Sequence, residues 1–314
     1  MTKSKKLLAI ILGMIMVFAL AACGGGEKTE ESKEESKTEE SAKEESKEES
    51  SEVAGGKATG AINVVSREEG SGTRGAFTEI TGVTKDKVDN TTPNAAIQNG
   101  TNNVMTYVAG DAQSIGYISL GSLDESVKAL KVDGVEATEE NVAAEKYPVS
   151  RPFNICYKED KLSDLAKDFI AFIMSKEGQE LALKEGVVPA DAAAKPYEKA
   201  GDMEGEIIVQ GSTSVAPYME VLEEAYMALH PGVKFNHTAN GSGEGIKAAI
   251  EEIADIGMAS RELKQEELDQ GVTPKAIAID GIAVIVSPEN PTEDITLEQI
   301  RQIFTGEVEN WDDL

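Results

Sequence analysis

The chain has 314 residues, and its 57 acidic residues outnumber its 30 basic ones by 27. This charge argues against a nucleic-acid binder, which normally presents a basic face, and against docking on an anionic membrane by charge alone. The charge is uneven: +3 over residues 1–23, −7 over 24–52 and −23 over 53–314. At roughly 150 residues per domain, the last region predicts one large or two modest domains.

The first residues have the pattern of a bacterial export signal. Three lysines precede an apolar run from Leu7 to Phe18, followed by small residues. The run is short for the ~30 Å of a bilayer's hydrocarbon core, although a transmembrane anchor is the alternative. It ends in Leu20-Ala-Ala-Cys23, which resembles the bacterial lipobox. We therefore expect a signal peptide over 1–22 and a lipidated Cys23; the alternative is a buried cysteine in an uncleaved helix.

Residues 23–52 should form a disordered tether behind that cysteine. Glu, Ser and Lys dominate the segment, and such a composition cannot bury enough apolar surface to offset the entropy of ordering. A single charged helix is the alternative, because Glu and Lys favour helix. The other cysteine, Cys156, lies in an apolar stretch and is expected to be a small core residue.

The remaining chain repeats the order strand, glycine-serine turn, helix three times. The turns are 67–75, 211–217 and 240–245, after apolar strands at 62–65, 206–209 and 233–238. Glycine permits tight turns and close approach of a ligand, and N–H groups at a helix start attract anions. A single turn of this kind is more often an ordinary helix cap. Three together, one with an adjacent arginine, favour an oxyanion site, and none matches a nucleotide-binding motif.

These turns also carry a family resemblance. The chain resembles the phosphate-binding protein of the bacterial phosphate ABC importer over essentially all of 53–314. The similar segments are Arg67–Arg74, Tyr147–Ile155, Gly211–Pro217, Gly241–Lys247, Ala254–Arg261, Asp280–Val286 and Phe304–Trp311. The resemblance implies an α/β fold of the type II periplasmic-binding-protein kind, in which two lobes enclose phosphate in the cleft between them.

The order of the segments departs from the family, because the family's second half comes first here. Joining Leu314 to Val53 restores the usual run, so the chain resembles a circular permutant whose old ends are fused near 195–205. Two partial copies joined by chance are the alternative. Termini that lie close together make such rewiring inexpensive. The resemblance then implies lobe A over 151–287 and a split lobe B over 53–150 plus 288–314.

The resemblance also implies the ligand contacts. Arg67 would give charge-assisted bonds to oxyanion oxygens, and Glu69 could orient it. The family has an Asp, which accepts the proton of hydrogen phosphate, where this chain has Arg261; Asp255 is expected to be a turn or core acid. The full phosphate-binding set expected is Arg67, Ser71, Gly72, Thr73, Thr213, Ser214 and Ser242.

We therefore expect a monomeric receptor on the outer face of the cell membrane, anchored through Cys23, that delivers phosphate to the permease subunits of an ABC importer. Binding of sulfate or molybdate, and a sensor or surface protein without a transport role, are the alternatives. An enzyme is not expected, because His230 reads as a helix end and His237 as part of a strand, with no triad, metal site or cofactor motif.

Overall fold

The computed structural model describes residues 58–314. These residues belong to one compact unit. The predicted signal peptide, Cys23 and the tether lie outside the described residues, as do residues 53–57. None of the helices in the described part is long and apolar enough to cross a membrane.

One mixed sheet runs through the unit, in the order β11-β10-β12-β8-β13-β5-β1-β4, with β6 and β9 pairing onto β13. Two further two-stranded sheets pair β14 with β7 and β2 with β3. The strands are β1 (Asn63–Arg67), β2 (Thr84–Lys85), β3 (Val88–Asp89), β4 (Ala96–Gln98), β5 (Ser114–Ser119), β6 (Lys128–Ala129), β7 (Lys131–Val132), β8 (Ser150–Tyr157), β9 (Val188–Pro189), β10 (Glu204–Gly211), β11 (Gly232–Ala239), β12 (Ile256–Ala259), β13 (Thr273–Val286) and β14 (Asp294–Ile295).

Within residues 58–314, five of the nine α-helices begin at a Ser or Thr whose hydroxyl caps a free N–H group. The hydroxyls of Ser163, Ser175 and Thr296, for example, accept hydrogen bonds from the first turns of α4, α5 and α9. The helices are α1 (Gly72–Ile80), α2 (Thr101–Ala109), α3 (Glu139–Ala143), α4 (Asp164–Ile173), α5 (Lys176–Lys184), α6 (Ala216–Leu229), α7 (Ser242–Ile250), α8 (Gln265–Leu268) and α9 (Leu297–Thr305), with short 3₁₀ turns η1 (Leu120–Ser122) and η2 (Trp311–Asp313).

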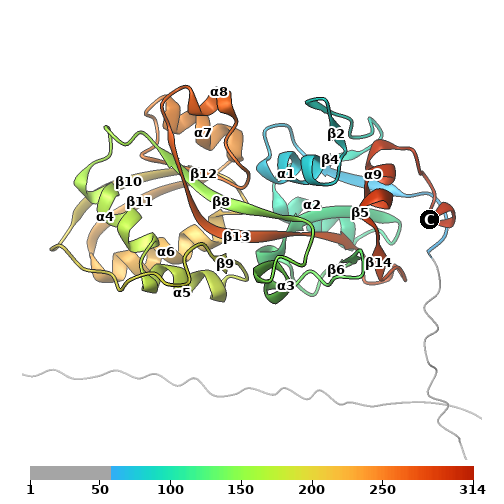
Figure 1. The fold of residues 1–314 in the computed structure, drawn as a ribbon, viewed down its shortest axis with the longest axis horizontal. Helices are drawn as coiled ribbons and strands as arrows, with labels where there is room; N and C mark the ends of the chain where they lie inside the picture. The colour runs from blue at the N-terminus through green and yellow to red at the C-terminus, as the bar shows by residue number, and fades with distance from the viewer. Residues whose placement is uncertain (1–57) are drawn as a thin grey trace, which may run out of the picture. The chain divides into compact units, whose positions relative to one another are not determined.

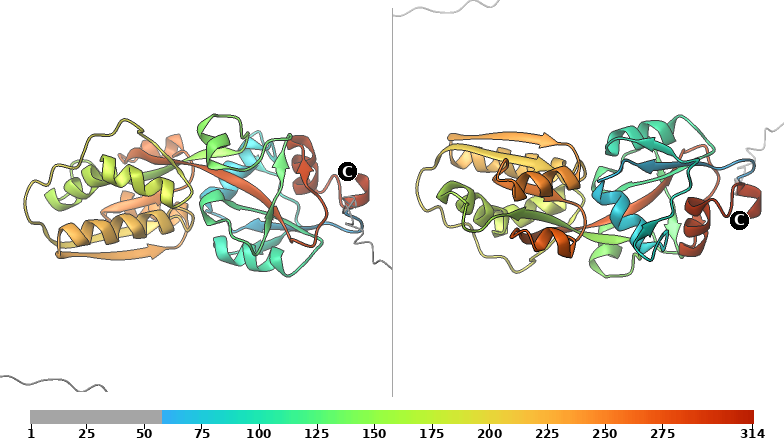
Figure 2. Two further views of the ribbon diagram at one scale, coloured as in Figure 1. Left: turned by 90° about the horizontal axis from the view of Figure 1, so that it is seen from below. Right: turned by 90° about the horizontal axis from the view of Figure 1, so that it is seen from above.

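Two long antiparallel strands join two groups of parallel strands. On one side β10 pairs in parallel with β11 and β12, and on the other β1 pairs in parallel with β4 and β5. Strands β8 and β13 run between these groups (Figures 1 and 2). β13 exchanges β8 for β5 as its partner between Gly281 and Ile282.

Each group of strands has its own apolar core. One core is built from buried residues between 153 and 278, including Phe169, Phe172 and Tyr226. The other combines buried residues from 58–149 with residues from 282–311, including Phe77 and Phe304. We call the half with β10–β12 and α4–α8 lobe A, and the half with β1–β7, β14, α1–α3 and α9 lobe B.

The end of the chain closes lobe B. Trp311 is 1% exposed, its backbone N–H donates to the carbonyl of Gly60 at 2.8 Å, and its ring N–H donates to Gln113 at 3.2 Å. An antiparallel bridge also joins Ala61 to Asn310. The two ends of the described chain therefore lie side by side.

The segment in which the family's ends are predicted to be fused is fixed onto lobe A. The backbone N–H of Lys176 donates to Lys195 at 2.7 Å. The hydroxyl of Tyr197 donates to Asp168 and lies 2.9 Å from Nε2 of His230, while Tyr226 donates to the same carboxylate at 2.7 Å. His230 is the C-cap of α6, as the sequence predicted.

Candidate functional site

Four helices begin where the two lobes face each other. Helices α1 and α2 follow parallel strands β1 and β4 of lobe B, and α6 and α7 follow parallel strands β10 and β11 of lobe A. The starts of α1 and α7 touch, because the N–H of Gly243 donates to the carbonyl of Gly70 at 3.0 Å. Figure 1 shows these two helices facing each other across the middle of the unit. Helix starts from both lobes thus direct free N–H groups and positive dipole ends to one place.

Side-chain hydroxyls gather at these helix starts. Apart from Thr213, which is half-buried, each is at most 4% exposed. Because a hydroxyl can both donate and accept a hydrogen bond and carries no charge, these side chains can bind an anion in more than one protonation state. We call the following residues the hydroxyl cluster: Thr73, Thr101, Ser212, Thr213, Ser214, Ser242 and Ser260.

The cluster is connected between the lobes. Thr73 of lobe B and Ser214 of lobe A share a hydrogen bond of 2.9 Å. The hydroxyl of Thr101, the first residue of α2, lies 3.4 Å from the hydroxyls of both Thr213 and Ser214. The space between the lobes is narrow at this point, since a Cβ on Gly72 would lie 2.2 Å from the Ser242 hydroxyl oxygen and 2.7 Å from that of Ser260.

Within lobe A, Ser260 joins the start of α7 to the start of α6. The Ser212 hydroxyl donates to that of Ser260 at 2.9 Å, and the Ser242 hydroxyl lies 3.3 Å from it. The backbone N–H of Ser260 donates to the Ser242 hydroxyl at 3.1 Å. Ser212 also accepts from the N–H groups of Ser214 and Val215 at 3.2 and 3.3 Å. These bonds hold the hydroxyls of lobe A in fixed positions relative to one another.

Arg67 brings a buried guanidinium to the cluster. The residue ends β1 and is 1% exposed. Its Nη2 donates to the Thr213 hydroxyl of the opposite lobe at 3.0 Å, and its Nη1 lies 3.5 Å from the Thr73 hydroxyl. Two further N–H groups bind both carboxylate oxygens of Glu68, at 2.7 and 2.8 Å. The carboxylate thereby holds the guanidinium in one orientation.

The electrostatic state of Glu68 follows from this pair. Burial opposes its ionisation, but the hydrogen bonds and positive charge of Arg67, with backbone N–H groups including that of Gly100, outweigh burial and hold the pKa of the carboxyl below 4.5. Glu68 is therefore ionised at neutral pH and neutralises Arg67. The site consequently binds an anion mainly through directed hydrogen-bond donors, because the positive charge of Arg67 is already balanced by Glu68.

A second buried guanidinium lies behind the cluster. Arg151 and Asp280 form an ion pair whose side chains are 1% and 0% exposed, with Arg151 Nη2 2.9 Å from Asp280 Oδ2. Arg151 Nη1 also donates to the backbone carbonyl of Ser260 at 2.9 Å. Both buried guanidiniums near the cluster therefore have a carboxylate partner.

The structure brings most of the predicted contacts together. Arg67, Gly72, Thr73, Thr213, Ser214 and Ser242 meet in and around the hydroxyl cluster. Ser71 is buried beside them, where its hydroxyl caps α1 by accepting from the N–H of Arg74 at 3.3 Å.

Glu69 and Arg261 do not contact the hydroxyl cluster. Glu69 lies in the turn after β1 and is exposed, and its neighbour Glu68 takes the expected pairing with Arg67. Arg261 gives both ends of its guanidinium to Glu267, at 2.7 and 2.8 Å, and none to the cluster. Cys23 lies outside the described residues. Asp255 accepts from the N–H of Ile208 at 2.8 Å, which is the structural role expected of it.

Sequence reasoning missed several residues of the site. Ser212, Ser260 and Arg151 lie inside segments that carried the resemblance, but no motif marked their side chains. Thr101 follows Gly100 at a helix start, a signal similar to the three recognised turns. Glu68 could be identified only from the direction in which the fold points Arg67. Asp280 could be identified only from Arg151, which is distant in sequence.

The described part of the chain offers oxyanion chemistry but no metal site. No group of three or more His, Cys, Asp or Glu within residues 58–314 is arranged to hold a metal ion. The hydroxyls, helix-start N–H groups and Arg67 form a set of donors directed inward from two lobes. Such a set suits a tetrahedral oxyanion, whose oxygens point in several directions.

The chain is similar to a known protein family and to named phosphate-binding proteins. The sequence profile of the PBP superfamily domain matches residues 39–177 and 191–314. The chain is 48% identical over 259 residues to a Streptococcus pneumoniae serotype 4 protein named Phosphate-binding protein PstS 2, covering 81% of this chain and 88% of that one. To Phosphate-binding protein PstS of Pseudomonas aeruginosa PAO1 it is 32% identical over 143 residues, covering 41% of this chain and 44% of that one.

A solved structure resembles the whole described unit. It is that of a phosphate ABC transporter, phosphate-binding protein from Streptococcus pneumoniae TIGR4, with a TM-score of 0.66 and 47% identity. The match covers 81% of this chain and 99% of that chain.

Proposed function

We propose that this chain, which belongs to the PBP superfamily and within it to the phosphate-binding proteins of the phosphate ABC importer, captures inorganic phosphate between lobes A and B. The observation that carries the proposal is the meeting of four helix starts, seven hydroxyls and Arg67 at one place between the lobes. The relatives' names, which state phosphate binding, point to the same ligand.

The binding residues are those that face this place from both lobes. Arg67 gives the charge-assisted bonds, and the remaining donors are hydroxyls and backbone N–H groups at the helix starts. The proposed contacts are Arg67, Ser71, Gly72, Thr73, Thr101, Thr213, Ser214 and Ser242. Because residues of both lobes are needed, bound phosphate holds the lobes together.

The proposal extends to delivery and location. The chain acts as a monomer at the outer face of the cell membrane, held by a lipid on Cys23 and the 24–52 tether, and passes phosphate to the permease subunits of an ABC importer. No catalytic step is part of this function. The pattern of the first 23 residues supports the location, and the relatives' description as parts of an ABC transporter supports the delivery.

We also propose that the chain is a circular permutant with lobe A over 151–287 and lobe B over 53–150 plus 288–314. A relative that carried the two halves in the opposite order would match this chain over about one half at a time. The Pseudomonas aeruginosa protein matches 41% of the chain, which supports this, whereas the Streptococcus pneumoniae PstS 2 protein matches 81% of the chain in one alignment and therefore shares this chain's order. The contact of Trp311 with Gly60 supports the rejoined ends.

Isothermal titration calorimetry of the purified protein tests the proposed function. We expect one phosphate per chain, with weak competition by sulfate and molybdate, and no release of product from a phosphomonoester. Saturation by sulfate at the same concentration as phosphate would assign the site to oxyanions in general. Absence of phosphate binding would refute the proposal.

A further inference from the structure

The Arg151–Asp280 pair is the most completely buried ion pair within residues 58–314. Its side chains are 1% and 0% exposed, and Arg151 binds Asp280 Oδ2 through both Nε and Nη2, at 3.1 and 2.9 Å. Moving both charges out of water is so costly that a buried ion pair often stabilises a fold no better than apolar residues would. The remaining donors and acceptors of the pair bind groups on both lobes.

The pair lies where the chain passes between the lobes. Arg151 and Asp280 are directly opposed partners on the neighbouring strands β8 and β13. Asp280 Oδ1 accepts from the Ser119 hydroxyl at 2.9 Å and lies 3.5 Å from the N–H of Gly121. Because Ser119 ends β5 of lobe B, the carboxylate ties the two passing strands to lobe B.

The other side of the pair reaches the hydroxyl cluster. Arg151 Nη1 donates to the backbone carbonyl of Ser260 at 2.9 Å. The N–H and hydroxyl of that same residue are bonded to Ser242 and Ser212, which lie at the starts of α7 and α6. A continuous set of hydrogen bonds thus runs from Ser119 through Asp280 and Arg151 to Ser260.

We propose that Arg151, held by Asp280, is a positioning residue for the anion site: it fixes the Ser260 peptide and thereby aims the Ser260 hydroxyl at the ligand. This inference rests on the proposed phosphate function. It assigns Ser260 as a further residue of the binding site and Arg151 as the group that acts through it. Lysine cannot replace Arg151 in this role, because one ammonium cannot hold a carboxylate and a carbonyl with the geometry of a planar fork.

A double-mutant cycle on phosphate affinity tests the inference. The variants are Arg151→Lys, Ser260→Ala and the two combined, with Arg301→Lys as the matched control, because Arg301 binds Glu298 and Glu307 at the surface of α9. We expect Arg151→Lys to weaken phosphate binding about tenfold, within the range of coupled neighbours, and the combined variant to bind like Ser260→Ala alone. Arg301→Lys should bind like the wild type.

The outcomes separate the inference from the function on which it rests. Wild-type protein that does not bind phosphate refutes both. In a second outcome, the wild type binds phosphate, but the affinity losses of Arg151→Lys and Ser260→Ala multiply in the combined variant. This outcome overturns the inference alone, because it shows a general structural defect that removing one hydroxyl does not mask. If Arg151→Lys fails to fold, Ser119→Ala replaces it, since it loosens the same pair from the far side. Its loss of affinity should likewise disappear in the Ser260→Ala background, and a loss that persists there overturns the inference.

Discussion

Adding one methyl group at Gly72 should separate phosphate binding from stability. Gly72 is the first residue of α1, and its φ lies outside the left-handed region that would require glycine. Alanine therefore fits the local backbone and favours the helix by up to ~1 kcal/mol. The new Cβ would, however, lie 2.2 Å from the Ser242 oxygen and 2.9 Å from its Cβ, whereas ordinary contact begins at 3.4 Å.

The structure leaves no easy relief for this clash. Rotation of the Ser242 hydroxyl would break its bond from the N–H of Ser260 and would leave the Ser242 Cβ in place. The start of α1 must therefore move away from lobe A. Overpacking of this kind costs ~1–3 kcal/mol, which corresponds to a roughly 5- to 150-fold loss of affinity if binding needs the lobes in contact here.

Calorimetric titration with phosphate, together with thermal unfolding of the ligand-free protein, measures both effects of Gly72→Ala. We expect the affinity to fall within that range while the melting temperature of the free protein stays within a few degrees of the wild type. Gly201→Ala is the control, because a Cβ there meets nothing within 4 Å. Wild-type affinity in Gly72→Ala would refute the claim that α1 and α7 must approach each other to hold the ligand.

Three further predictions concern stability and reactivity. Arg67 outweighs burial and holds the pKa of Glu68 below 4.5, so the pair stabilises the fold above about pH 4.5. This contribution is lost as pH falls through the folded pKa. In urea unfolding, the difference in unfolding free energy between wild type and Glu68→Gln should therefore shrink on acidification. Cys156 is fully buried, and burial raises the pKa of its thiol to about 12, so a thiol reagent should label it only in unfolded protein. Truncation after Val308 removes Trp311 from the core and should cost ~3–5 kcal/mol, as for loss of a buried Trp, in urea unfolding.

Each of these has a contrary result. A constant difference between wild type and Glu68→Gln from pH 7 to pH 3.5 would show that the carboxylate does not stabilise the fold through its charge. Labelling of native Cys156 at the rate of a free thiol would contradict its burial. An unchanged urea midpoint after truncation would show that the chain end does not support lobe B.

The fold was largely predictable because its signals are local. The repeated order of apolar strand, glycine-serine turn and helix predicted the parallel strands and helix starts, and the family resemblance supplied the two-lobe α/β arrangement. Both are confirmed by the related solved structure and by the superfamily match. The burial of Cys156 and the helix end at His230 are also as predicted.

The details of the site depended on geometry that the sequence does not contain. Glu68 and Glu69 are adjacent and identical in type, and only the path of the chain after β1 decides which one reaches Arg67. Arg261 stands where the family has an Asp, but Glu267 on the following short helix α8 holds its guanidinium. Arg151 and Asp280 are 129 residues apart, and their pairing follows from the register of two strands.

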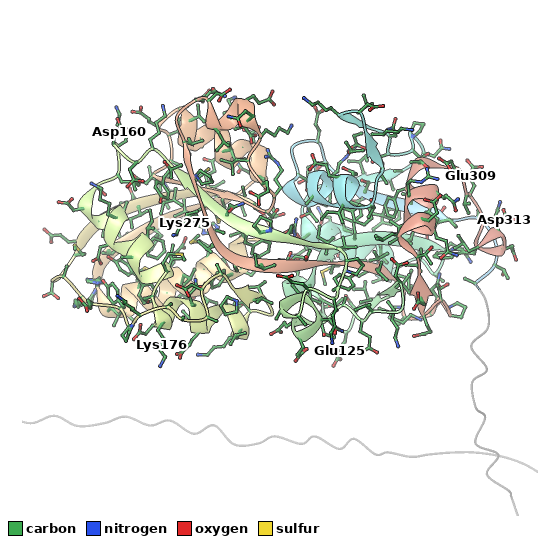
Figure 3. The ribbon with its side chains drawn as sticks, viewed as in Figure 1. Glu125, Asp160, Lys176, Lys275, Glu309 and Asp313 are labelled. Carbon is green, nitrogen blue, oxygen red and sulfur yellow. The ribbon has the colours of Figure 1, made fainter. Side chains whose placement is uncertain are left out.

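The acidic character of the chain is compatible with an anionic ligand because the charges and the site are separate. Charged side chains such as Glu125, Asp160, Lys275, Glu309 and Asp313 project from the surface (Figure 3), where salt screens them within ~8 Å. The donors of the site are buried between the lobes. Capture of the anion therefore depends on short hydrogen bonds from hydroxyls, helix starts and one oriented guanidinium.

The affinity of phosphate for wild type and for Arg67→Ala, measured side by side by calorimetry, tests this account most directly. Arg67 is the charged group that contacts hydroxyls of both lobes. We expect the wild type to bind one phosphate and Arg67→Ala to lose at least ~2 kcal/mol, or roughly 30-fold in affinity, as for truncation of one buried charge-paired partner. Equal phosphate affinity in the two proteins would contradict the assignment of the site.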